Sequence, residues 1–145
     1  MEIDCILLVE DNEDDVLLFQ ASLEDADILN PVHVVGSAEN AISYLAGTGD
    51  YADRSLYPLP RVVFVDLHLP GKSGHDILEW MLREPELRDV LKVVLTGSKD
   101  PRHYTRALEL GANAYLEKPV TKEQLIGPCR NLRMVLAGGN RPGRD

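Results

Sequence analysis

Unbroken aliphatic runs constrain the fold of this chain more than any other feature of its sequence. Four of them lead directly into polar residues, and they occupy residues 6–9, 62–65, 93–95 and 114–116. Continuous runs of this kind are typical of strands in a parallel sheet that is covered on both faces. They alternate with segments of helical periodicity, which predicts an α/β domain with right-handed crossovers between parallel strands.

Periodicity and capping residues predict where the elements begin and end. Strands are expected at about residues 3–9, 32–36, 61–66, 91–96 and 113–117, and helices at about residues 13–28, 38–47, 74–83, 101–110 and 121–136. Asn12, Asp100 and Thr121 are suited to N-cap the first, fourth and last helices. The last helix contains Gly127-Pro128, yet its apolar stripe continues beyond this pair, so a kinked helix is expected.

Length and charge limit the classes of function that the chain can have. Its 145 residues suit one domain, expected over residues 1–137, followed by a Gly- and Pro-rich tail over residues 138–145 that is expected to be disordered. The net charge of -9 gives no general attraction to nucleic acid or to a membrane surface. No long apolar stretch and no signal-like N-terminus occur, so the expected location is cytoplasmic. Cys5 and Cys129 match no redox or metal spacing and are expected to be buried.

Polar residues at the ends of the aliphatic runs form the candidate site. They are Glu10-Asp11, Asp66, Thr96-Gly97 and Lys118-Pro119. Because ligands bind beyond the carboxyl ends of parallel strands, these residues are expected to meet in one crevice. Its carboxylates suit a hard dication such as Mg²⁺, and an aspartate is able to attack phosphorus and carry an acyl phosphate. Taken singly, each residue has a plain structural explanation, as a helix start, a strand threonine or a solvent-facing lysine, but together they predict phosphoryl chemistry.

With these residues in place, the sequence resembles the receiver domain of two-component response regulators over about residues 3–136. The resemblance rests on the residues just named and on Leu69-Pro70 through Gly74, which stand at the family's distance from the phosphoacceptor. Residues 9–12 and the long connection over residues 47–60 resemble the single-domain regulators paired with phytochromes. The fold that this family implies is flavodoxin-like: a doubly wound (βα)5 domain with a five-stranded parallel sheet in the order 2-1-3-4-5.

The resemblance also implies a role for each site residue. Asp66 would be the phosphoacceptor, with Mg²⁺ held by the Glu10, Asp11 and Asp66 side chains and the backbone carbonyl of His68. Lys118, before Pro119, would contact the phosphoryl group. Thr96 would bind the phosphoryl group and act with Tyr115 as a switch, while Gly97 and Ser98 would flank phosphoryl access.

Partners follow from the same resemblance. The donor would be a cognate histidine kinase, with a phytochrome-type sensor as one candidate. The face formed by the fourth helix, fifth strand and fifth helix would change, as a homodimer contact or as a surface for a downstream protein or phosphotransfer partner. About nine residues follow the expected last helix, too few for a DNA-binding output module, so a single-domain regulator is expected.

Two departures and two rival functions remain open. Glu10 stands where many receivers carry aspartate, and Ser73 stands before Gly74 where aspartate is frequent. The rivals are a Mg²⁺-dependent aspartyl-phosphate phosphohydrolase, which usually needs an acid where His68 stands, and an unphosphorylated binding module of the same fold. His33, His75 and His103 share no metal-ligand spacing, so the sequence favours no transition-metal site.

Overall fold

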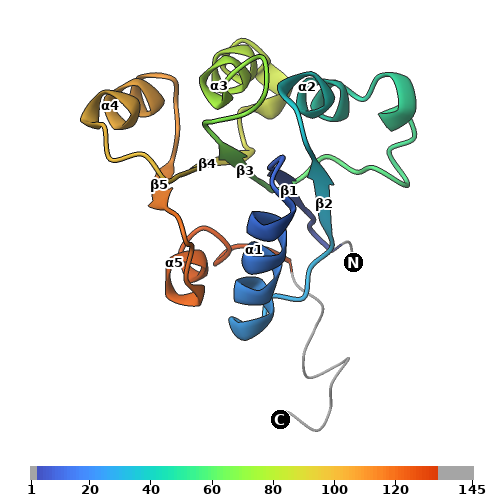
Figure 1. The fold of residues 1–145 in the computed structure, drawn as a ribbon. Coiled ribbons are helices and arrows are strands. Elements are labelled where there is room, and N and C mark those ends of the chain that lie inside the picture. Colours follow the sequence, from blue (N-terminus) through green and yellow to red (C-terminus); the bar gives the residue numbers. More distant parts are fainter. Residues whose placement is uncertain (1–2, 134–145) are drawn as a thin grey trace, which may run out of the picture.

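A computed structural model of the chain describes residues 3–133. Five parallel strands form one sheet in the order β2-β1-β3-β4-β5, as predicted. Helices α2, α3 and α4 cover one face of the sheet, and α1 and α5 cover the other (Figure 1). The strands are β1 (Ile6–Val9), β2 (Val32–Val35), β3 (Val62–Asp66), β4 (Leu91–Thr96) and β5 (Ala114–Glu117), and the helices are α1 (Glu13–Asp25), α2 (Ala38–Ala46), α3 (Gly74–Leu82), α4 (Pro101–Glu109) and α5 (Lys122–Ile126), with 3-10 turns at Gly49–Tyr51 and Pro85–Leu87.

Alternating side chains of the inner strands build a separate core on each face of the sheet. Leu7 and Val9 of β1 pack with residues of α2 and α3, whereas Ile6 and Leu8 pack with residues of α1 and α5. All four of these side chains are buried, as are the aliphatic residues of β3. The aliphatic runs are therefore continuous because both faces of the inner strands are covered by helices.

The predicted caps are confirmed, and the last helix is shorter than expected. Asn12 and Thr121 accept hydrogen bonds from the backbone of the first turns of α1 and α5, at 3.0 and 3.4 Å. The prediction of one kinked helix over residues 121–136 is wrong for its described part, because α5 ends at Ile126. Pro128 has no N–H to continue the ladder, but the chain keeps turning and Cys129 N–H donates to the Leu125 carbonyl at 3.1 Å.

The long connection over residues 47–60 is an ordered, packed segment. The Arg54 guanidinium donates to the carbonyls of Tyr44 and Leu45 at 2.7 Å each, at the end of α2, and to that of Tyr57 at 3.2 Å. The Tyr44 hydroxyl donates to the Pro58 carbonyl at 2.9 Å. The Tyr44 carbonyl also accepts from the Gly47 N–H at 3.1 Å, and one side chain of the connection adds hydrogen bonds to the last carbonyls of α2.

Three smaller expectations have different outcomes. Cys5 and Cys129 are buried and unpaired, as predicted. The expected tail over residues 138–145 lies outside the described residues. Within residues 3–133 no helix is long and apolar enough to cross a membrane.

Candidate functional site

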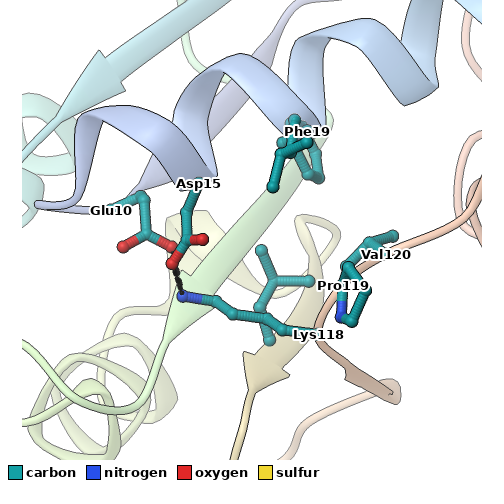
Figure 2. A pocket seen from close by; sticks show the side chains of 8 residues that line it. Glu10, Asp15, Phe19, Lys118, Pro119 and Val120 are labelled. Atoms are coloured by element: carbon teal, nitrogen blue, oxygen red, sulfur yellow. Dashed lines mark hydrogen bonds and ion pairs between the residues drawn. The ribbon is translucent and has the colours of Figure 1, made fainter.

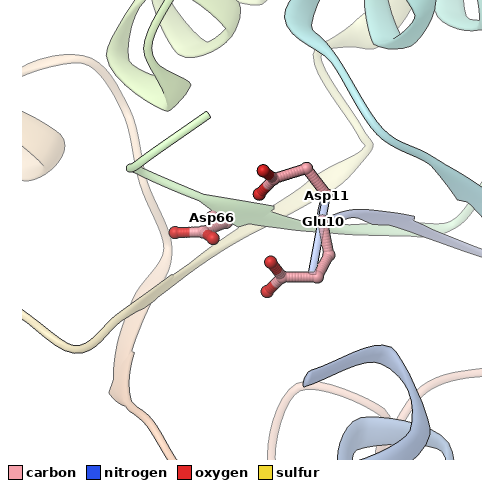
Figure 3. Close-up of side chains that lie close together, drawn as sticks. All are labelled: Glu10, Asp11 and Asp66. Atoms are coloured by element: carbon pink, nitrogen blue, oxygen red, sulfur yellow. The ribbon is translucent and has the colours of Figure 1, made fainter. Parts of the chain in front are cut away.

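Three carboxylates meet at the carboxyl edge of the sheet. Strands β1 and β3 are parallel neighbours with Val9 opposite Val65, so Glu10 and Asp66 are the next residues in register. Oxygens of Glu10, Asp11 and Asp66 lie within 4.8 Å of one another, and the three side chains converge (Figure 3). Glu10 is 3% and Asp66 is 4% exposed, whereas Asp11 is exposed to solvent. The pocket therefore combines two buried acids with one that faces solvent.

Lys118 reaches this pocket from the end of the edge strand β5. It follows β5, and its Nζ lies 2.9 Å from Asp66 Oδ2 and 2.5 Å from Glu10 Oε1. The same Nζ lies 2.9 Å from Asp15 Oδ2 in the first turn of α1, where Figure 2 shows the lysine extending toward both Glu10 and Asp15. The peptide bond between Lys118 and Pro119 is cis. One ammonium thus contacts three carboxylates.

Asp15 is a site residue that the sequence analysis counted only as a favourable charge at the start of a helix. It lies in the first turn of α1, four residues after Asp11, and this closeness in sequence to the acidic pair was the available signal. The contact with Lys118 depends on how α1 packs on its face of the sheet, and no sequence pattern encodes that placement.

The electrostatics of the pocket reflect crowding of like charge. Burial, together with the neighbouring Asp66 carboxylate, raises the pKa of Glu10 to about 7, even though Lys118 lies against it. Burial disfavours the charged form of Lys118, but hydrogen bonds to Glu10, Asp15 and Asp66 outweigh it and raise the pKa of the lysine. Three carboxylates contact the single ammonium and Asp11 adds a fourth acid to the pocket, so the excess negative charge favours a bound cation.

The donor set fits a hard dication. Carboxylate oxygens from three residues gather at one point, and Asp11 leaves that point open to solvent. Mg²⁺ takes one or a few carboxylates and keeps several waters, so a pocket that is part protein and part solvent suits it. Among the described residues, Glu10, Asp11 and Asp66 are the group of potential metal ligands whose ligand atoms already lie close together.

The remaining predicted residues surround the acidic pocket. Thr96 ends β4 and is fully buried, and its Oγ1 accepts from the Ser98 N–H at 2.9 Å across Gly97. The His68 N–H donates to Asp66 Oδ1 at 2.9 Å, while the His68 side chain is exposed. Burial raises the pKa of Tyr115, and a hydrogen bond with the Thr96 side chain acts in the opposite direction. Each predicted residue therefore lies at the carboxyl edge or on the strand beside it.

A doubly wound α/β sheet with this acidic pocket and an opposed lysine defines a class of phosphoryl-dependent signalling domains, and comparison with known proteins identifies the family. The family model of the response regulator receiver domain matches residues 6–129. The chain belongs to this receiver domain family.

Individual relatives support the assignment. The probable methanogenesis regulatory protein FilR2 of Methanothrix harundinacea is 34% identical over 139 residues, which cover 95% of this chain and 87% of that protein. Response regulator Rcp1 of Synechocystis is 33% identical over 113 residues, covering 78% of this chain and 75% of that protein. These relatives match most of their own length to this chain.

Solved structures agree with the fold. The bacteriophytochrome response regulator AtBRR is 36% identical with a TM-score of 0.79, covering 94% of this chain and 97% of the other. The phosphorylated cyanobacterial phytochrome response regulator RcpA is 30% identical with a TM-score of 0.75, covering 87% and 88%. The Mn²⁺-bound form of Rcp1 is 31% identical with a TM-score of 0.73, covering 83% and 86%. Similar structures thus include a phosphorylated form and a form with a bound dication.

Proposed function

We propose that this chain is the phosphoacceptor of a two-component pathway and that Asp66 is the residue phosphorylated by a histidine kinase. The observation that carries the proposal is the 2.9 Å contact between Lys118 Nζ and Asp66 Oδ2 inside a pocket with an excess of carboxylates. A carboxylate that is 4% exposed and paired with an ammonium is positioned to act as a nucleophile on an incoming phosphoryl group.

The chemistry balances with the kinase phosphohistidine as donor. A carboxylate oxygen of Asp66 attacks phosphorus, the P–N bond to the imidazole breaks, and the imidazole leaves as the neutral ring after taking up a proton. The product on this chain is an acyl phosphate. Lys118 neutralises oxygen charge on the phosphoryl group as it arrives, since its Nζ already lies beside the attacking carboxylate.

A divalent metal ion is part of the proposal. Glu10, Asp11 and Asp66, with the backbone carbonyl of His68, would hold Mg²⁺, which supplies positive charge against the repulsion between Asp66 and the donor phosphoryl oxygens. Rcp1, which is similar to this chain, is known in a Mn²⁺-bound form. Glu10 and Asp66 stand side by side at the carboxyl ends of β1 and β3, so the backbone need not move for the two carboxylates to share an ion.

The switch is proposed to run from Thr96 to α4 and β5. Thr96 Oγ1 holds the Ser98 N–H, and exchange of that bond for a phosphoryl oxygen would draw in the loop that leads to α4. Tyr115 lies between Thr96 and the exposed Tyr104 of α4, whose ring centre is 5.3 Å from its own. Exposed Tyr104 and Leu108 make α4 the proposed docking face for a downstream partner or a second copy.

The kinase is proposed to be a phytochrome-type sensor, because similar proteins are response regulators of phytochromes and bacteriophytochromes. In this proposal the chain turns over no external substrate, and its catalysis is limited to its own phosphorylation and slow dephosphorylation.

Mass spectrometry of the intact protein tests the proposal. Incubation with acetyl phosphate and Mg²⁺ is expected to add the mass of one phosphoryl group, and both a chelator and Asp66→Asn are expected to abolish the addition. Asp14→Asn is the matched control, because Asp14 is an exposed acid in the same first turn of α1 as Asp15. Release of phosphate from many small monoesters would instead favour a hydrolase, and an unchanged mass with every donor would favour a bare binding module.

A further inference from the structure

Three of the four histidines lie together beside the acidic pocket, although they are distant in sequence. His68 stands in the loop after β3, His75 in the first turn of α3, and His103 in the first turn of α4. The ring centre of His103 lies 5.5 Å from that of His68 and 5.8 Å from that of His75. No sequence pattern encodes this cluster, because its members come from three elements that meet only at the carboxyl edge of the sheet.

The hydrogen bonds of the cluster leave nitrogen lone pairs available. His103 Nδ1 lies 2.9 Å from Ser98 Oγ, so its Nε2 is the nitrogen left for a ligand. His75 Nε2 lies 3.4 Å from the His103 carbonyl, which only accepts, so Nε2 carries the proton and Nδ1 has the lone pair. Burial lowers the pKa of His75, which keeps this ring neutral near pH 7. Engagement of one ring nitrogen while the other binds is the usual arrangement around metal-bound histidine.

The spacing of the rings suits one cation. Nitrogens at about 2.0–2.1 Å from a tetrahedral Zn²⁺ place neighbouring ring centres roughly 5 Å apart. The two measured separations exceed this by less than 1 Å. As the side chains stand, their nitrogens do not converge on one point, so binding would require the exposed His68 ring to turn toward the nitrogens that the hydrogen bonds of His75 and His103 leave available. Three imidazoles leave the fourth position of a tetrahedral ion open to water.

We propose that His68, His75 and His103 form a second metal site, separate from the acidic pocket, that binds a borderline divalent transition-metal ion such as Zn²⁺ or Ni²⁺. The two sites differ in chemistry, because imidazole nitrogen selects such ions whereas the carboxylates of the acidic pocket select Mg²⁺. The bound ion would join α3, α4 and the loop that follows Asp66.

Calorimetric titration of the untagged full chain tests this site. Mg²⁺ is kept in millimolar excess to occupy the acidic pocket, and Zn²⁺ or Ni²⁺ is then added. Saturable binding of one ion per chain is expected. Loss of one ligand in His103→Gln or His75→Gln is expected to weaken binding at least about tenfold, since even loss of an outer hydrogen-bond partner costs about 10–100-fold.

The fourth histidine provides the matched control. His33 lies on β2 with its ring 5.5 Å from that of Tyr44, remote from the cluster, and His33→Gln is expected to bind as the wild type does. Asp66→Asn is also expected to retain the Zn²⁺ affinity, which separates this site from the acidic pocket. Circular dichroism melting checks that every variant folds.

A second readout follows the rings themselves. The imidazole ¹H–¹⁵N signals of His68, His75 and His103 are expected to shift together when Zn²⁺ is added, while those of His33 stay in place. Absence of saturable binding, or unchanged affinity in both His75→Gln and His103→Gln, would overturn the proposal. So would a loss of Zn²⁺ binding in Asp66→Asn, because the acidic pocket would then be the site.

Discussion

Substitution of Gly74 by alanine is expected to destabilise the fold by forcing apart α3 and the end of β3, beside Asp66. Gly74 begins α3 and is buried, and its N–H donates to the Leu67 carbonyl at 3.1 Å. A Cβ at this position would lie 2.5 Å from the Asp66 carbonyl oxygen, 2.9 Å from Val65 Cγ1 and 3.0 Å from Leu67 Cα. Ordinary contacts of a Cβ begin near 3.4 Å, so α3 and the end of β3 must separate by almost 1 Å.

The cost follows from what has to move. The closest atom is backbone of the central strand, which cannot rotate away as a side chain could, and overpacking of this kind costs about 1–3 kcal/mol. Taking roughly 2 kcal/mol, and about 2–4 °C per kcal/mol for a domain near this length, the melting temperature is expected to fall by about 4–8 °C. The φ angle of Gly74 is not in the left-handed region, so backbone strain contributes nothing to this figure.

Thermal and urea unfolding followed by circular dichroism measure the effect. Gly97→Ala is the matched control, because Gly97 also lies at the carboxyl edge of the sheet and no atom lies within 4 Å of the position its Cβ would take. Its free energy of unfolding is expected to stay within about 0.5 kcal/mol of the wild type. If Gly74→Ala melts with the wild type, the close approach of α3 to β3 described above is wrong.

Three further predictions concern the metal, the long connection and pH. Mg²⁺ at 100 times its dissociation constant is expected to stabilise the fold by about 2.7 kcal/mol, and Asp11→Asn should largely remove this effect. A melting temperature that does not change with millimolar Mg²⁺ would contradict the metal assignment. Arg54→Ala removes three hydrogen bonds to carbonyls at the end of α2 and in the connection, and is expected to lower the free energy of unfolding in urea by about 2 kcal/mol. The control Arg88→Ala, at an exposed position, should lower it by under about 0.5 kcal/mol, and equal losses of stability in the two variants would refute this role of Arg54. Burial opposes ionisation of Asp4, but hydrogen bonds from Arg133 outweigh it and lower the pKa of Asp4 from its ordinary value. This pair therefore stabilises the fold above the unfolded pKa, and the contribution is lost as pH falls through the folded pKa. Asp4→Asn is therefore expected to be about 1 kcal/mol less stable than the wild type at pH 7 and equal to it near pH 2, and a difference that persists at low pH would refute the ion pair.

Local and repeated patterns in the sequence predicted most of the helices and strands, whereas the order of the strands in the sheet was predicted from the resemblance to the receiver family. Aliphatic runs such as residues 62–65 are readable since both faces of an inner strand are buried, and Asn12 and Thr121 mark helix starts by short-range hydrogen bonds. The residues of the candidate site were also predictable, because each stands at the end of a strand and parallel strands bring those ends to one edge.

The packing of the helices on the sheet determines which side chains meet across that edge. Asp15 joins Lys118 because the packing of α1 on the sheet brings its first turn to the carboxyl edge, and His68, His75 and His103 gather because α3 and α4 begin side by side. The end of α5 at Ile126 likewise depended on whether packing of Cys129 and Leu132 could hold a continuous helix past Pro128, and it could not. Contacts between residues on different elements depend on how those elements pack, and that geometry is a property of the whole fold rather than of any local pattern.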